Sequence, residues 1–85
     1  MVDMVLLIEE IEKNVADFNI KAAMEKVAAL TEKIILASNS LEQSKLEKMM
    51  DTMGLMNSAL SNKDYLLLSD VLEYELKPFI NMNIK

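Results

Sequence analysis

Apolar residues recur every three or four positions along four segments of the chain, and short polar stretches separate these segments. This spacing places the apolar side chains on one face of an α-helix. It predicts helices over about residues 2–15, 20–38, 41–61 and 65–77. The four apolar stripes consist of Met4, Ile8, Ile11, Val15 and Phe18; Ile20, Ala23, Val27, Leu30, Ile34 and Ala37; Leu46, Met49, Met53, Met56 and Leu60; and Tyr65, Leu68, Leu72, Leu76 and Phe79.

The residues at the polar breaks are typical of helix ends. Asn19 and Asp64 each precede a predicted helix, and their side chains can accept hydrogen bonds from backbone N–H groups of its first turn. Asn39 suits the left-handed conformation that ends many helices. Ser40 and Gln43 have the spacing of a capping box, which predicts that the third helix begins just after Ser40.

Two residues interrupt the predicted helices. Gly54 lies inside the third helix, where glycine costs about 1 kcal/mol relative to alanine. We expect it to mark a close crossing with another helix, the alternative being a weak point at which the helix bends. Pro78 lacks a backbone donor and disfavours the helical conformation at Lys77, so the fourth helix should end or kink there.

The short breaks favour a small all-α, up-and-down bundle of four helices in a single domain, residues 1–85. The two longest helices, 20–38 and 41–61, are expected to form its central hairpin. The first helix is apolar on more than one side, which predicts a central position or contact with another subunit. Because 52% of the 85 residues are apolar, the chain has more apolar surface than so short a chain buries. We therefore expect a homodimer that completes the bundle, with segment 65–85 packed in its own chain or against the second copy.

Composition and charge remove several classes of function. The chain has no Cys and no His, which excludes disulfide scaffolds and imidazole chemistry. Its net charge is −5 and all nine cations are lysines, so neither nucleic acid nor an anionic membrane is an expected partner. No apolar run approaches the roughly 18 residues of a membrane span, and no basic segment precedes the first apolar patch. The expected location is the cytoplasm, and the use of Lys, Ile and Asn without Arg suggests a bacterial source.

Few residues are candidates for catalysis. Glu9 with Glu12, and Asp70 with Glu73, are carboxylate pairs of the kind that act as general acid and base. Both pairs fall on polar helix faces, where solvated side chains are expected. The serines lie at helix ends or lack a base partner. The chain has no His for a bundle metal site. Its single Gly is too few for a glycine-rich phosphate loop, and no segment has the Gly and the oxygen ligands of a calcium loop. We expect a non-enzymatic protein with no cofactor and no metal.

Methionine and aromatic residues supply the candidate partner-binding surface. Methionine side chains adapt to several partner shapes, and the chain has eight. Met49, Met53 and Met56 share the apolar stripe and are assigned to the core, whereas Met50 is displaced from it. Aromatic residues are enriched at interface centres, and segment 65–85 holds most of those in this chain. The predicted partner-binding residues are Met50, Tyr65, Leu67, Tyr74, Phe79 and Ile80.

These observations favour a protein–protein interaction module, in which a homodimeric bundle binds a partner's helix through an apolar patch. In size, acidity and helical content the chain is similar to bacterial export chaperones of the flagellar type, a likeness of architecture that no residue motif carries. That likeness implies, as an alternative, a small chaperone or adaptor for an aggregation-prone helix. A further alternative is a minimal enzyme subunit that uses Asp70 or Glu73.

Overall fold

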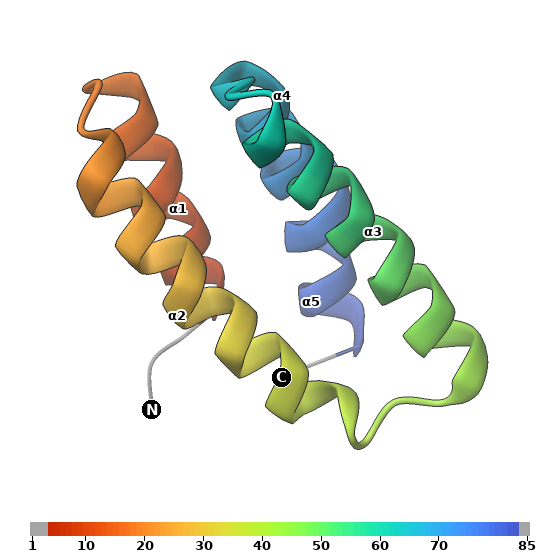
Figure 1. The fold of residues 1–85 in the computed structure, drawn as a ribbon. Helices are drawn as coiled ribbons and strands as arrows, with labels where there is room; N and C mark the ends of the chain where they lie inside the picture. The colour runs from red at the N-terminus through yellow and green to blue at the C-terminus, as the bar shows by residue number, and fades with distance from the viewer. Residues whose placement is uncertain (1–3, 84–85) are drawn as a thin grey trace.

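The computed structural model describes residues 4–83 and confirms the all-α prediction, since it contains no strand over this range. The first three helices are α1 (Met4–Ala16), α2 (Ile20–Ser38) and α3 (Gln43–Ser61). The fourth is continuous and has three parts: α4 (Tyr65–Val71), the π-helical turn η1 (Leu72–Leu76) and α5 (Lys77–Asn83). Figure 1 shows the four helices as an up-and-down bundle. The predicted start of the first helix at residue 2 lies outside the described residues.

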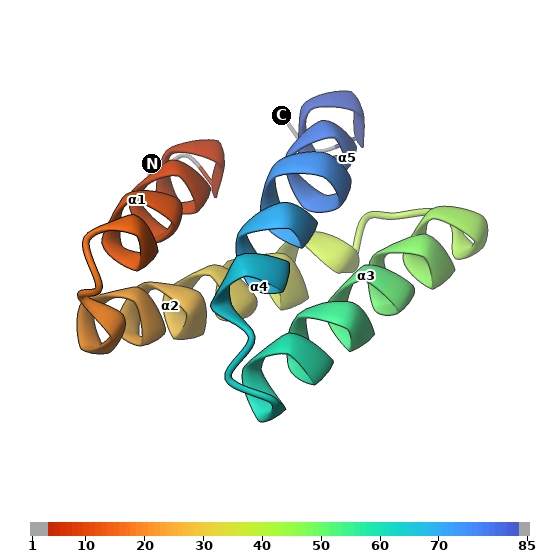
Figure 2. The same cartoon turned by 90° about the horizontal axis from the view of Figure 1, so that it is seen from above.

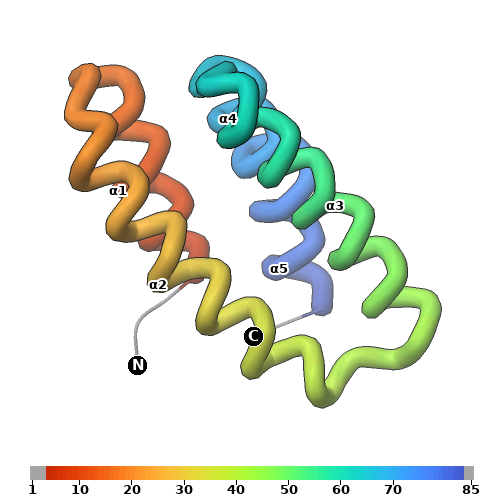
Figure 3. Tube along the Cα trace, in the orientation of Figure 1, coloured from red at the N-terminus to blue at the C-terminus, as the bar shows by residue number. Residues whose placement is uncertain are grey.

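The prediction of a central α2–α3 hairpin is wrong. The chain forms one hairpin from α1 and α2 and a second from α3 and α4, as the trace in Figure 3 shows. α1 and the C-terminal helix pack against each other between the two outer helices, and α2 and α3 diverge (Figures 1 and 2). The reason is that α1 is apolar on more than one side, so it needs neighbours on more than one side. α3 begins with mostly polar residues and suits an outer position.

All four helices contribute to a single core. The predicted stripes supply most of it, including Met49 and Met56, while Met53 is partly buried against it. Complete burial of a Leu, Ile or Met side chain contributes roughly 1.5–3 kcal/mol, so this core supplies most of the stabilisation. The buried apolar residues are Leu7, Ile8, Ile11, Ala23, Val27, Leu30, Ile34, Met49, Met56, Ala59, Leu68, Val71, Leu72, Leu76, Phe79 and Ile80.

In the connection between α2 and α3, neither Asn39 nor Ser40 has the capping role that the sequence predicted. Asn39 has φ −63° and remains in the right-handed helical region, so it is not a left-handed terminator. The Ser40 hydroxyl donates to the carbonyl of Ala37 at 3.0 Å and therefore closes α2 instead of capping α3. α3 begins at Gln43 after Glu42, without a side-chain cap, so the capping-box prediction is also wrong.

Of the two predicted alternatives at Lys77, an end or a kink, the end is wrong, because the fourth helix continues to Asn83. The turn before Pro78 widens: the N–H of Lys77 donates to the carbonyl of Leu72, five residues earlier. This π-helical turn accommodates Pro78, which has no backbone N–H to donate and whose ring would disrupt a regular α-helix. The chain therefore keeps its last helix and places Phe79 and Ile80 in the core.

Gly54 does not mark a close helix crossing, which corrects the favoured interpretation of this residue. It is exposed, and a Cβ atom built on it would meet nothing within 4 Å. α3 runs through this position as regular α-helix. No contact in the described chain requires a glycine here.

Candidate functional site

A shallow groove lies where the α1–α2 turn approaches the α3–α4 turn. Its volume is about 690 Å³. Both turns are at the same end of the bundle, as the ribbon in Figure 1 shows. The apolar residues of the groove are Val15, Ala16, Phe18, Ile20, Tyr65 and Leu66, and the polar ones are Glu12, Lys63, Asp64 and Ser69.

Two turns of the same type build this groove. Phe18 and Lys63 both have left-handed backbone, with φ 58° and 53°. In the first turn, the N–H of Phe18 donates to Val15 and that of Asn19 to Asn14, at 3.0 and 2.8 Å. The second turn has the equivalent pair: Lys63 donates to the carbonyl of Leu60, and Asp64 to that of Ala59, at 3.1 and 2.8 Å. Each is a Schellman motif, which reverses the chain tightly at a helix end.

The predicted N-caps are confirmed in both turns. The Asn19 side chain accepts from the N–H of Ala22 at 3.4 Å, and the Asp64 side chain accepts from the N–H of Leu67 at 3.1 Å. Because each cap directly follows its left-handed residue, the start of the next helix is fixed relative to the turn.

Phe18 is the most unusual residue of the groove. The left-handed position of a Schellman motif is normally glycine, because a side chain there costs roughly 1–2 kcal/mol. A phenylalanine in this position is still 88% exposed, so it gains almost no burial within this chain. Leu66, in the first turn of α4, is 80% exposed on the same groove. Strained backbone is often found at functional sites, and here it presents an aromatic ring to solvent.

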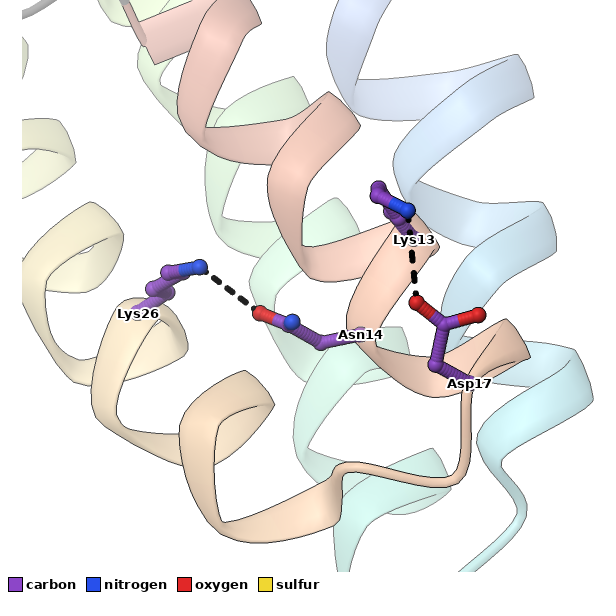
Figure 4. Close-up of polar contacts among 4 residues, drawn as sticks. All are labelled: Lys13, Asn14, Asp17 and Lys26. Atoms are coloured by element: carbon purple, nitrogen blue, oxygen red, sulfur yellow. Dashed lines mark hydrogen bonds and ion pairs between the residues drawn. The ribbon is translucent and has the colours of Figure 1, made fainter.

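Ion pairs hold the first wall of the groove in place. Lys26 of α2 reaches α1, with its Nζ 2.8 Å from Oδ1 of Asn14 and 3.6 Å from Oε1 of Glu10. Lys13 Nζ lies 3.4 Å from Oδ2 of Asp17, next to the turn (Figure 4). Only the contacts of Lys26 join α2 to α1, because Lys13 and Asp17 are four residues apart at the end of α1. Exposed pairs contribute little individually.

A cluster of carboxylates borders the groove where α1 meets η1. Lys77 Nζ lies 2.9 Å from Oε1 of Glu73 and 3.4 Å from Oε2 of Glu9. Glu12, which lines the groove, lies beside Glu73 and hydrogen-bonds to it. Partial burial, together with the charge of Glu73, raises the pKa of Glu12 from 4.5 to about 7. The hydrogen bond from Lys77 is the main reason that the pKa of Glu73 is lowered.

The two predicted carboxylate pairs are rearranged by the fold. Glu12 comes from one pair and Glu73 from the other, and the two meet across the α1–η1 contact. Asp70 is exposed, and Glu9 pairs with Lys77. Sequence spacing compares residues on one helix only, so it gave no sign of this contact. Within residues 4–83, no group of three carboxylates is arranged to hold a metal ion.

The predicted partner-binding residues have three different locations. Tyr65 lines the groove and is partly buried. Met50, Leu67 and Tyr74 are exposed but do not line it. Phe79 and Ile80 belong to the core of their own chain and are not on its surface, because the helix continues past Pro78.

Of the groove residues named above, only Tyr65 was predicted as partner-binding; Phe18, Ile20 and Leu66 are the large apolar residues that the prediction missed. Phe18 and Ile20 were assigned to apolar stripes that face the core. The one available signal was an aromatic residue between Asp17 and Asn19 at a helix end, where burial is hard to achieve.

The fold and the groove define a small all-α bundle with an open apolar groove at one end. The chain belongs to a family described as a domain of unknown function, DUF8042, whose model matches residues 2–82. Comparison with curated proteins gave no match, and comparison with solved structures gave none either. Across the described helices, none has the length and apolar character needed to cross a membrane.

Proposed function

We propose that this protein is a non-enzymatic interaction module that binds an amphipathic helix of a partner protein in the groove between its two turns. The observation that carries the proposal is Phe18, an aromatic residue that is 88% exposed in a conformation that favours glycine. A residue that costs stability and gains no burial is explained if a partner covers it. Amphipathic helices bind apolar grooves through side chains spaced three or four residues apart.

The charge of the chain favours a different protein over a second copy as the occupant. Each copy has a net charge of −5, and the polar wall of the groove has two carboxylates, Glu12 and Asp64, against one cation, Lys63. A second copy would add like charge, whereas a neutral or basic helix would not. The homodimer expected from the sequence is therefore not part of this proposal, and the test described below distinguishes the two.

The test is a titration with a designed probe, an 18-residue peptide that has a leucine face and a glutamine face and is labelled for fluorescence anisotropy. We expect saturable binding, which Leu66→Ala weakens about tenfold or more, as for a residue at an interface centre. Leu36→Ala is the matched control, since Leu36 is also an exposed leucine, at 67%, on a helix. It lies 16 residues beyond Ile20, about 24 Å along α2, and should leave the affinity unchanged.

Four results would contradict the proposal. The first is no binding of the peptide, and the second is equal weakening by both leucine variants. The third is that sedimentation shows a dimer that Leu66→Ala dissociates, which would make a second copy the occupant. Partitioning of the chain onto neutral phosphatidylcholine vesicles through Phe18 and Leu66 would instead make a lipid surface the occupant.

A further inference from the structure

We infer that the partner helix continues beyond the groove along the outer side of the C-terminal helix, where it covers Tyr74 and Met82 as well as Leu66. The inference rests on the proposed function, because it gives the same partner helix a second contact surface, and with it a direction and a minimum length.

The first argument is that the most exposed apolar side chains are grouped. Within residues 4–83, the four most exposed large apolar residues are Phe18 at 88%, Met82 at 83%, Leu66 at 80% and Tyr74 at 73%. Exposed apolar residues that are scattered singly are normal on a protein surface. These four are not scattered. Phe18 and Leu66 line the groove, and Leu66, Tyr74 and Met82 lie on the one helix that α4, η1 and α5 form.

The second argument is that the π-helical turn η1 brings these residues to one side of the helix. Each residue of a regular α-helix turns by about 100°, so Met82 would lie about 160° around the axis from Leu66. The π-helical turn takes in about one residue more than an α-helical turn, which reduces this angle to about 60°. Every fourth residue from 66 to 82 is accordingly exposed. We call this row the exposed stripe; it consists of Leu66, Asp70, Tyr74, Pro78 and Met82.

The third argument is that the exposed stripe begins in the groove. Leu66 belongs to both, since it lines the groove and is the first residue of the stripe. Met82 lies 16 residues further on, about 24 Å along the helix that Figure 2 shows as continuous from α4 to α5. A partner helix that starts against Phe18 and Leu66 and follows this direction meets Tyr74 after about two turns and Met82 after about four. One amphipathic helix can therefore cover the groove and the stripe together.

The charges on this side favour such a partner over a second copy of the chain. Asp70 is the one charged residue of the exposed stripe. The cation that follows it on the same helix, Lys77, forms ion pairs with Glu9 and Glu73, so its charge is used within the chain. A second copy would bring another Asp70 and a net charge of −5 to this side, whereas a neutral or basic amphipathic helix would not.

The experiment measures binding of the 18-residue leucine–glutamine peptide to Tyr74→Ala, Met82→Ala and the double variant by fluorescence anisotropy. As a helix the peptide is about 27 Å long, enough to reach from Leu66 to Met82. We expect each single variant to weaken binding about threefold and the double variant about tenfold. Met50→Ala is the matched control, because Met50 is also an exposed methionine, at 64%, on α3. It should leave the affinity unchanged, and so should Tyr74→Phe, which keeps the ring.

A shorter peptide shows whether Tyr74 and Met82 act by direct contact. An 11-residue form, cross-linked to keep it helical, is about 17 Å long and spans the groove without reaching Met82. We expect Leu66→Ala to weaken binding of this short peptide, and the double variant to bind it as well as the unchanged chain does. Circular dichroism verifies that each variant is folded.

The outcomes distinguish the two proposals. If the 18-residue peptide does not bind the unchanged chain, the proposed function fails. If it binds and Leu66→Ala weakens it, but the double variant weakens it no more than Met50→Ala, the groove stands as a binding site and its extension along the helix is overturned. Equal weakening of the short and the long peptide by the double variant would also overturn the extension, because the two residues would then act through the fold.

Two other occupants of the exposed stripe would overturn the inference. Sedimentation of the chain alone could show a dimer that Tyr74→Ala dissociates, which would make a second copy the occupant. Partitioning onto neutral phosphatidylcholine vesicles that Met82→Ala abolishes would make a lipid surface the occupant. We expect neither a dimer of this kind nor partitioning.

Discussion

At the scale of a single residue, Phe18 has a backbone conformation that lowers stability and a side chain that is exposed. The effect on stability can be measured. Its left-handed backbone disfavours a side chain, and its ring makes little contact with the rest of the chain. We expect Phe18→Gly to raise the free energy of unfolding by about 1 kcal/mol. For a domain of this size, that corresponds to an increase in Tm of about 4–8 °C, measured by thermal unfolding. The same variant should lose binding of the amphipathic peptide, so that stability and binding move in opposite directions.

Lys63→Gly is the matched control for stability, because Lys63 occupies the equivalent position in the second turn, with φ 53°. It should raise the Tm by a similar amount. If Phe18→Gly lowered the Tm while Lys63→Gly raised it, the ring of Phe18 would have a structural role in its own chain, and the main argument for the groove would be lost.

At the scale of a helix, α3 contains a glycine that the fold of this chain does not require. Gly54 is exposed, with open space where a Cβ atom would be. We expect Gly54→Ala to stabilise the chain by up to about 1 kcal/mol, through higher helix propensity and fewer unfolded conformations. Chemical denaturation gives this difference directly. Ala28→Gly, at an exposed site inside α2, is the reverse substitution and should cost a similar amount.

Destabilisation by Gly54→Ala would contradict this expectation. It would mean that another surface approaches α3 closely at Gly54. Since nothing in the described chain does so, that surface would belong to a second copy, and sedimentation of the variant would then show less dimer than the unchanged chain.

The helices could be predicted from the sequence because their causes are local. Three-four spacing marks a buried face, and Asn19 and Asp64 cap their helices through atoms three residues away. The end of the fourth helix could not be predicted, because Pro78 is accommodated by the wider turn before it. An apolar stripe also indicates that one face of a helix is buried, but it does not indicate which other helix covers that face. For that reason the prediction of α2 and α3 as the central pair was wrong, and the contact of Glu12 with Glu73 was not predicted.

At the scale of the whole molecule, the contact of Glu12 with Glu73 joins the N-terminal hairpin to the C-terminal helix. It therefore makes the free energy of unfolding depend on pH. The pKa of Glu12 is about 7 in the folded chain and lies above its ordinary value of 4.5. Between these values the folded chain holds more protons than the unfolded chain, so stability falls as pH rises from about 4.5 to about 7 and is then constant. The lowered pKa of Glu73 acts in another window, since its contribution is present above the ordinary value and is lost at lower pH.

We therefore expect the free energy of unfolding, measured by urea titration, to fall by on the order of 1 kcal/mol from pH 5 to pH 8, once screening of the partly exposed Glu12 is allowed for. Glu12→Gln should remove this decrease and be more stable than the unchanged chain at pH 8, because a glutamine amide can donate to Glu73 without adding charge. Glu47→Gln, which makes the same change of charge at an exposed site on α3, should retain the decrease. Equal slopes in the unchanged chain and Glu12→Gln would show that the two carboxylates do not share a proton. In that case the α1–η1 contact would be held by the apolar core and Lys77 alone.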